Sequence, residues 1–372
     1  MHILMLPFLA FGHVSPFAQL ARKLVSVEGG FRVTFLTADG NLLRVEAMLA
    51  SAAGVVTVVP LHLPRVPGLP EGAASTAELT ADGAELLKVT LDGTSDQVSS
   101  LLSELHPDAA LIDFATPSVS DLAAPLGIKV LHFSVFSAVT GAYTVVPVAP
   151  RPHAADFTYI FTSFDGQPCI HDRVVAGIKA CDGIVIKSCA EMEAPYIRHK
   201  LPLHPVRQAR ASHRTRRAGA AARRARGARW ADWLSSFPDN AVVFASFGSE
   251  TNLPFLVPPR FQERVKGRGV VHTGWVQQQH ILRHRSVGCY LNHAGFSSAV
   301  EGLVAGCRLV FLPMKGDQYI NAALFSAVSR TAGSDARMDG RKWREFLTHD
   351  DVQKRFARDF VRQLNELVVR TA

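Results

Sequence analysis

The chain has 372 residues, of which 48% are hydrophobic and 19% charged. At about 150 residues per domain, this length predicts two domains with separate cores, and the composition excludes a disordered or fibrous protein. The formal net charge of +8 comes from one segment, because residues 195–231 contain ten Arg, one Lys and no acidic residue, which leaves −3 for the rest of the chain. The folded body is therefore expected to be mildly acidic.

In the first half, apolar runs of strand length alternate with amphipathic stretches of helix length, which predicts a parallel sheet with helices on both faces. The expected strands are His2–Pro7, Val33–Ala38, Val55–Pro60, Ala109–Phe114 and Lys129–Ser134. The expected helices are Ser15–Val27, Gly83–Leu105 and Ser118–Leu126, the last ended by Gly127. Ligands of such sheets bind beyond the carboxyl ends of strands, where His13 and Asp113 stand.

The second half repeats the alternation, so the fold class is α/β with two Rossmann-like domains facing each other across a cleft. Its expected strands are Val242–Phe247, Val270–Thr273, Gly288–Asn292 and Leu309–Pro313. Its expected helices are Gln277–His284, Ser297–Ala305, Gln318–Ser329 and Trp343–Val368. We expect an N-terminal domain over residues 1–197, an irregular basic linker over 198–229, a C-terminal domain over 230–345 and a C-terminal helix over 346–372.

Two stretches do not follow this alternation. Leu201–Arg229 is rich in Ala and Arg and has no apolar period, so we expect it to lie outside both cores. Its arginines raise the alternative of nucleic-acid binding, but the segment has no interleaved aromatic residue for stacking, so no nucleic-acid partner is expected. Ser249–Gly269 joins two expected strands with about twenty residues that include three prolines, which leaves little room for a full crossover helix.

Cysteine usage and the apolar runs bear on the compartment. Five cysteines without a C-x-x-C pair indicate neither a disulfide framework nor a zinc site, so no metal is expected. No Lys or Arg precedes the apolar run Ile3–Phe11, unlike in a signal peptide, and no run reaches the roughly 18 residues of a membrane-spanning helix. We expect a cytoplasmic protein without stable membrane insertion.

The segment from His293 to Glu301 carries the clearest chemical pattern. An expected strand ends in a His, Gly295 makes a turn, and Ser297 and Ser298 open a helix. Unpaired N–H groups and the positive end of the helix dipole suit an anionic diphosphate at this point. Glu301, one turn further on the same face, can accept hydrogen bonds from a ribose diol.

Further residues around this segment suit a nucleotide sugar. Trp275 offers a flat face for a base, and Gln278 an amide to read the edge of the base. Asp317 and Gln318 follow the strand Leu309–Pro313, and their side chains suit sugar hydroxyls. Each residue also has an ordinary structural interpretation, since Trp275 can be a core aromatic and the serines and Asp317 can be helix caps. Their order and spacing favour the functional interpretation.

These residues also carry a resemblance. The stretch Trp275-Val276-Gln277-Gln278, His293-Ala294-Gly295-Phe296-Ser297-Ser298, Glu301, Gly306, Pro313, Asp317-Gln318 resembles the 44-residue signature box of plant UDP-dependent glycosyltransferases of glycosyltransferase family 1. The resemblance covers residues 1 to about 197 and 230 to 330. It implies the GT-B fold and an inverting sugar transfer without a metal ion, with a UDP-sugar as co-substrate and no other cofactor. The implied partners are the UDP-sugar donor and a small lipophilic or glycosylated acceptor, and a monomer is expected.

The resemblance also implies roles for single residues. His13 matches the general base, which an acceptor hydroxyl with a pKa well above 7 requires, and Asp113 matches the carboxylate that orients it. The implied donor contacts are Trp275 and Gln278 to uracil, Glu301 to ribose, His293, Ser297 and Ser298 to the diphosphate, Ser249 on the phosphate side, and Asp317 and Gln318 to the sugar. Val276 and Gly295 complete the expected donor site. Which sugar is transferred stays open, although Gln318 is the usual residue for glucose or xylose.

The chain departs from the family pattern in informative ways. Phe296-Ser297 replaces the usual Trp-Asn and Val276-Gln277 the common Ala-Pro, which resembles the branch that extends glycosides such as an anthocyanin 3-O-glucoside. Relatives have a further helix and strand between Ser249 and Val270, and a strand where this chain has Thr331 to Met338. Lost segments are therefore expected, and the alternative function is a catalytically impaired glycosyltransferase-like protein.

Overall fold

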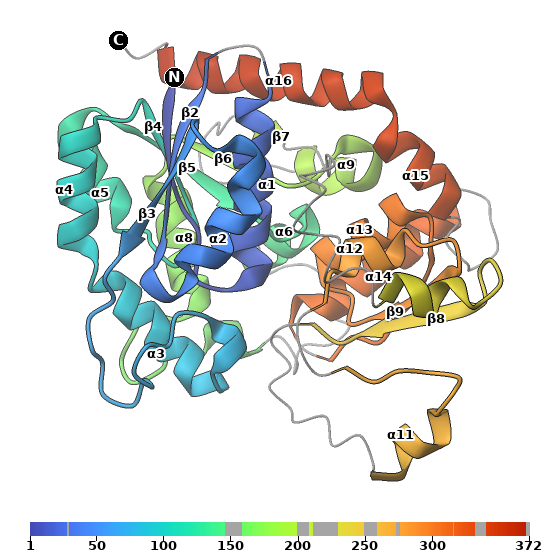
Figure 1. Ribbon diagram of the computed structural model, residues 1–372. Helices are drawn as coiled ribbons and strands as arrows, with labels where there is room; N and C mark the ends of the chain where they lie inside the picture. Colours follow the sequence, from blue (N-terminus) through green and yellow to red (C-terminus); the bar gives the residue numbers. More distant parts are fainter. Residues whose placement is uncertain are drawn as a thin grey trace.

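The structure is a computed structural model that describes residues 1–27, 30–145, 158–198, 208–210, 230–248, 259–272, 276–314, 316–331 and 340–369. Two parallel sheets with their helices follow each other along the chain (Figure 1). No helix within these ranges is both long enough and apolar enough to cross a membrane.

The first sheet has seven strands in the order β3-β2-β1-β4-β5-β6-β7, and every neighbouring pair is parallel. The strands are β1 (His2–Leu6), β2 (Arg32–Ala38), β3 (Val56–Leu61), β4 (Ala109–Ile112), β5 (Lys129–Ser134), β6 (Gly183–Ile186) and β7 (Gln208–Arg210). All residues of β1 and β4 are buried, because helices cover both faces of the sheet. The five strands expected in this half are confirmed.

Successive side chains of each strand point to opposite faces of the sheet and pack into two separate cores. On one face, Ile3 and Met5 of β1 pack with helices α1 (Phe11–Val25), α2 (Leu42–Leu49) and α16 (Asp350–Val369). On the other face, Leu4 and Leu6 pack with α3 (Ala81–Asp92), α4 (Ser95–Leu105), α5 (Val119–Ala123) and α8 (Ile170–Ala180). Two further helices of this half are α6 (Ala138–Val145) and α9 (Ala190–Arg198).

Helix boundaries differ from the sequence-based expectation at two places. Helix α1 begins at Phe11 rather than at Ser15, since backbone bonds to the Ala10 carbonyl start it without any side-chain cap that the sequence reveals. The expected helix Gly83–Leu105 is divided into α3 and α4, because the chain turns at Gly93, where a Cβ would stand 2.7 Å from Pro64 Cγ. The stop at Gly127 is confirmed, with a left-handed φ of 69°.

The second sheet has three described strands in the order β10-β9-β8, namely β8 (Val242–Ser246), β9 (Val287–Asn292) and β10 (Arg308–Phe311). The helices around it are α11 (Pro259–Val265), α12 (Gln278–Leu282), α13 (Phe296–Ala305), α14 (Asp317–Thr331) and α15 (Gly340–Thr348). The expected strand Val270–Thr273 is wrong for its described residues 270–272, which form no ladder, because β8 has no described neighbour besides β9. Thr273 and the stretch around Ala332–Met338 lie outside the described residues.

One face of this second sheet is uncovered within the described part of the chain. Val243 is 62% exposed and Val310 48% exposed, and the strand register places both on the same face. The other face is covered, with Tyr290 fully buried. A parallel sheet normally has helices on both faces, yet Figure 1 shows α11 standing apart from the strands.

Two expectations about the linker and the C-terminus need correction. Gln208–Arg210, in the segment expected outside both cores, pairs with β6 as an edge strand, since ladder bonds need backbone atoms rather than apolar side chains. Residues 201–207 and 211–229 of that segment lie outside the described residues. The expected C-terminal helix is two helices, because Asp350 and Asp351 start α16 anew with the acidic first turn that a helix N-terminus favours. Helix α15 packs beside α13, while α16 returns to the first sheet (Figure 1).

Candidate active site

His13 and Asp113 form a buried pair at the carboxyl edge of the first sheet. His13 lies in the first turn of α1, and Asp113 directly follows β4. The His13 Nδ1 atom is 2.7 Å from Asp113 Oδ2, and both residues are buried. The expected proximity of these two residues is confirmed.

Asp113 is held by more than the imidazole. The backbone N–H groups of Phe8 and Phe114 donate to its two oxygens at 3.1 and 2.8 Å. Burial alone would raise the pKa of Asp113, but the charge of His13 and these hydrogen bonds outweigh burial and hold the pKa below its ordinary value. An ionised carboxylate only accepts hydrogen bonds, so His13 donates from Nδ1, and in the neutral imidazole the lone pair is then on Nε2.

Three phenylalanine rings surround the imidazole of His13. The ring centroids of Phe8, Phe114 and Phe136 lie 5.6, 5.5 and 5.4 Å from that of His13. Phe133, three residues before Phe136 in sequence, does not join them and packs on Phe17 in the core, with ring centroids 4.7 Å apart. The surroundings of His13 are thus apolar and aromatic, as suits a planar lipophilic compound.

The turn from β9 into α13 is built around His293. Asn292 Oδ1 accepts from the Ala294 N–H at 2.9 Å, and Ala294 takes a left-handed φ of 63°. A Cβ on Gly295 would stand 2.5 Å from His293 Nε2, and one on Gly248 would stand 2.8 Å from the same atom. The two glycines therefore make room for the imidazole. The N-cap residue of α13 is Gly295, which has no side chain to cap the helix.

The first turns of α13 bring several expected residues together. Ser297 Oγ accepts a hydrogen bond of 2.9 Å from Lys187 Nζ, and Ser298 follows it, half-buried. Glu301 accepts from Gln278 Nε2 at 3.0 Å and from Gln279 Nε2 at 2.9 Å. Gln278, expected at the base, is thus paired with the residue expected at the ribose. Sequence reasoning missed Gln279, although it adjoins Gln278 in one polar run, and also missed Lys187.

The first turn of α14 holds Asp317 and Gln318, the expected sugar contacts. Gln318 is buried, and its Oε1 accepts from the Met314 N–H at 2.8 Å. Asp317 Oδ2 accepts from Asn321 Nδ2 at 2.9 Å. Sequence reasoning missed Asn321, although a polar residue four positions after Asp317 on a helix is a neighbour by geometry.

Asn321 connects the two units of the structure, the first built on the sheet β1 to β7 and the second on the sheet that contains β8, β9 and β10. Ser137 Oγ, from the first unit, donates to Asn321 Oδ1 at 2.7 Å, and Asn321 Nδ2 donates to the Ala294 carbonyl at 3.0 Å. Ser137 directly follows Phe136, whose ring contacts His13, and Ala294 directly follows His293. The neighbours of the His–Asp pair and of the α13 turn are therefore joined through Asn321 at the contact between the two units.

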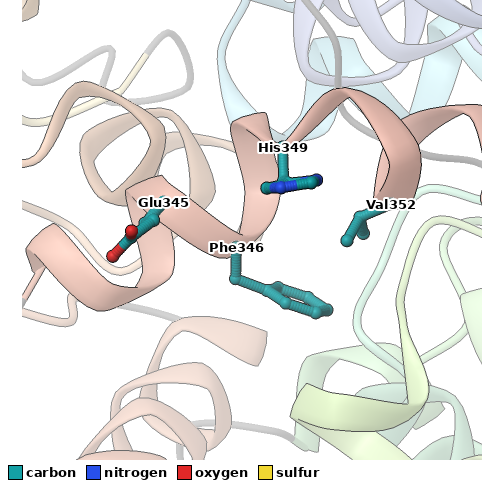
Figure 2. Close-up of a pocket in the computed structure, with 4 residues that line it drawn as sticks. All are labelled: Glu345, Phe346, His349 and Val352. Carbon is teal, nitrogen blue, oxygen red and sulfur yellow. The ribbon is translucent and has the colours of Figure 1, made fainter.

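Three expected donor contacts, Val276, Ser249 and Trp275, are not among the contacts given above. Val276 packs half-buried against the core of the second unit. Ser249 and Trp275 lie outside the described residues. In the described part of the chain no group of three or more His, Cys, Asp or Glu residues can hold a metal ion. A pocket between α15 and α16 is lined by Glu345, Phe346, His349 and Val352 and contains none of the expected site residues (Figure 2).

Comparison with known proteins identifies the family. The family model of UDP-glucoronosyl and UDP-glucosyl transferases matches residues 263–339. Anthocyanidin-3-O-glucoside rhamnosyltransferase of Petunia hybrida is 36% identical, with 99% of this chain and 96% of that protein covered. The chain belongs to the UDP-glycosyltransferases.

Other glycosyltransferases agree with this assignment. UDP-glycosyltransferase 79A2 of Stevia rebaudiana is 34% identical, with 99% of this chain and 98% of that protein covered. The crystal structure of Arabidopsis thaliana UGT89C1 with quercetin superposes with a TM-score of 0.75 at 24% identity, covering 99% and 98% of the two chains. The fold is therefore GT-B, as expected. The alignment with the Petunia relative runs over 467 residues, against 372 in this glycosyltransferase, so segments of the relative have no counterpart here.

Proposed function

We propose that this UDP-glycosyltransferase transfers a sugar, with inversion, from a UDP-sugar to a hydroxyl of a lipophilic acceptor that already carries a sugar. The observation that carries the proposal is the hydrogen bond between His13 and Asp113, held in an aromatic surrounding and connected through Asn321 to the N-terminus of α13. In this arrangement His13 is the base, and the N-terminus of α13 is the group that binds an anion. That is the arrangement an in-line displacement needs.

In this mechanism His13 acts on the acceptor. Its Nε2 takes the proton of the acceptor hydroxyl while the oxygen attacks the anomeric carbon of the donor. The bond from that carbon to the diphosphate oxygen breaks, and UDP leaves with the electron pair. Attack opposite to the leaving group inverts the configuration. Asp113, fixed by Phe8 and Phe114, keeps the His13 tautomer and stabilises the imidazolium that forms.

On the donor side, we propose that the α13 N-terminus binds the departing diphosphate. His293, Gly295, Ser297 and Ser298 form that end of the helix, and its dipole favours negative charge. Glu301 is assigned to the ribose. Asp317 and Gln318 are assigned to the sugar, and Ser249, Trp275, Val276 and Gln278 to the remaining donor contacts.

The acceptor class is inferred from the aromatic surroundings of His13 and from a relative. The three phenylalanines suit a planar, apolar ring system. The Petunia hybrida relative is named for transfer of rhamnose to an anthocyanidin 3-O-glucoside. We infer an anthocyanidin or flavonoid glycoside as acceptor.

The test is UDP release by the purified full chain. UDP-glucose, UDP-xylose and UDP-rhamnose are each offered with an anthocyanidin 3-O-glucoside and with the sugar-free aglycone. Release that depends on the glucoside supports the proposal. A folded protein that releases UDP with neither acceptor contradicts it.

The uncovered face of the second sheet favours a second candidate, a form whose catalysis is impaired. Val243 and Val310 stand exposed where a parallel sheet normally has a helix. A second unit lacking one covering layer holds the α13 turn less firmly. In this candidate the chain binds its ligands weakly and turns over slowly.

A further inference from the structure

Lys187 is a buried cation at the junction of the two units. It directly follows β6 and is only 4% exposed. Its Nζ donates to Ser297 Oγ at 2.9 Å, across 110 residues of sequence. Ser297 stands in the first turn of α13. A side chain from the first unit, which carries His13, therefore reaches the helix end that we assign to the donor diphosphate.

Lys187 has no carboxylate within ion-pair distance in the described part of the chain, and Glu301 attracts it only from further away. Glu301 itself is engaged by Gln278 and Gln279. Burial lowers the pKa of Lys187 to about 8, and the attraction of Glu301 only partly opposes this. Taking an ammonium group out of water without a counter-ion costs several kcal/mol, so a residue of this kind favours a ligand that supplies negative charge.

The neighbouring helix end adds to the same effect. The N-terminus of α13 carries the positive end of the helix dipole, and its N-cap residue, Gly295, offers no side chain to cap it. Two positive groups, the ammonium and the helix end, thus meet at Ser297. They repel each other until an anion lies between them.

We propose that Lys187 binds the diphosphate group of the nucleotide sugar and stabilises its charge as UDP leaves. This inference rests on the proposed function and adds to it a donor contact from the opposite unit. Because the ammonium belongs to the first unit and α13 to the second, a donor bound to both also holds the two units together. The competing interpretation is that Lys187 only connects the units through Ser297 and touches no ligand.

The experiment compares UDP with uridine, which lacks the diphosphate. Titration calorimetry is run on the full chain, on Lys187→Met, on Lys187→Arg and on the exposed control Lys179→Met. We expect Lys187→Met to weaken UDP binding by about tenfold or more, since a charge-assisted hydrogen bond is lost, and to leave uridine binding unchanged. Lys187→Arg retains most of the affinity, and Lys179→Met all of it.

A pH series separates ligand contact from a structural role. With the pKa of Lys187 at about 8 before UDP binds, deprotonation weakens UDP binding by about five- to tenfold between pH 7 and pH 9. An arginine stays charged over this range, so the affinity of Lys187→Arg is flat. This comparison holds even where Lys187→Met fails to fold.

The outcomes distinguish this inference from the function on which it rests. A wild-type chain that binds neither UDP nor uridine overturns the proposed donor site and this inference together. A wild-type chain that binds UDP, with the same affinity as Lys187→Met or the same pH slope as Lys187→Arg, overturns this inference alone.

Discussion

The imidazole of His293 occupies the space that a side chain at Gly295 would need. A Cβ at Gly295 would stand 2.5 Å from His293 Nε2, far inside contact distance, although the φ of Gly295 is an ordinary −61°. Gly295→Ala is therefore expected to displace the ring from the α13 N-terminus. We expect about tenfold weaker UDP binding and about 1–3 kcal/mol lower stability from the overpacking. Titration with UDP and urea unfolding measure the two effects.

Gly141→Ala is the matched control for this prediction. Gly141 lies within α6, and a Cβ there would meet nothing within 4 Å. Because alanine favours a helix over glycine, this change should leave UDP binding intact and stabilise the protein by roughly 0.5–1 kcal/mol. Equal UDP affinities for Gly295→Ala and Gly141→Ala would contradict the assigned role of His293.

His13→Ala tests the base. A general base acts on the acceptor in the transition state and does not contact the nucleotide, so kcat should fall by about a hundredfold or more while the Kd for UDP stays nearly unchanged. Steady-state UDP release and UDP titration give the two numbers. A variant with normal kcat would remove His13 from the mechanism, and a parallel loss of UDP binding would point to a structural defect.

Asp113→Asn tests the residue that orients the base. The amide cannot accept from Phe8, Phe114 and His13 together, so kcat and stability should both fall. The pKa of Asp113 is lowered from its ordinary 3.8, so its contribution to stability is present above about pH 4 and is lost as the pH falls through the folded-state pKa. The stability difference between wild type and Asp113→Asn should therefore shrink below pH 4. Urea unfolding at pH 3, 4, 5 and 7 measures it, and a constant difference would contradict the ionised state.

The sequence predicts five of the seven strands of the first sheet, because their signal is local, and misses β6 and β7. An apolar run such as His2–Leu6 is buried on both faces and needs no partner to be recognised. Helix ends are predicted less well where long-range contacts decide them. The division between α3 and α4 at Gly93 depends on Pro64, which lies far away in sequence, and α1 starts without a capping side chain.

The candidate site shows the same contrast. His13 and Asp113 could be predicted to meet, since each follows a strand of one parallel sheet. The contacts of Lys187 with Ser297 and of Asn321 with Ser137 could not, because each joins residues far apart in sequence that belong to different units. Only the pairing of Asn321 with Asp317 follows from helical spacing. The described residues 270–272 of the strand expected at Val270–Thr273 show the reverse error, since a β-branched run forms no ladder when no described strand lies beside it.

Asn321→Leu tests the connection between the units. Asn321 is fully buried and joins Ser137, the Ala294 carbonyl and Asp317. Replacing it removes all three contacts, which should cost about 3 kcal/mol. Ser137→Ala also removes the bonds between Ser137 Oγ and Thr140, so a double-mutant cycle of the two changes is needed to isolate the Ser137–Asn321 bond, for which we expect about 1 kcal/mol. Urea unfolding compares the two single variants and the double variant with the wild type. Strictly additive effects in the double variant would contradict the coupling between Ser137 and Asn321.

The last prediction concerns activity and follows from the uncovered face of the second sheet. Val243 and Val310 expose 62% and 48% of their surface there, and the relative from Petunia hybrida aligns over 467 residues against the 372 of this chain. We attribute the open face to the missing segments. A lost covering layer removes buried apolar contacts on a scale comparable with the roughly 5–15 kcal/mol that stabilises a domain.

A chimera tests this directly, with the residues between β8 and α12 replaced by the aligned segment of the Petunia hybrida relative. We expect the chimera to release UDP at least tenfold faster than the chain as it stands, to bind less of a dye that reports exposed apolar surface, and to unfold at a higher temperature. The control, Val243→Thr with Val310→Thr, should lower dye binding without raising turnover, since it makes the face more polar without restoring the layer that supports α13. Turnover by the unaltered chain that equals that of the chimera would show that the α13 turn is held well enough for catalysis without the added segment.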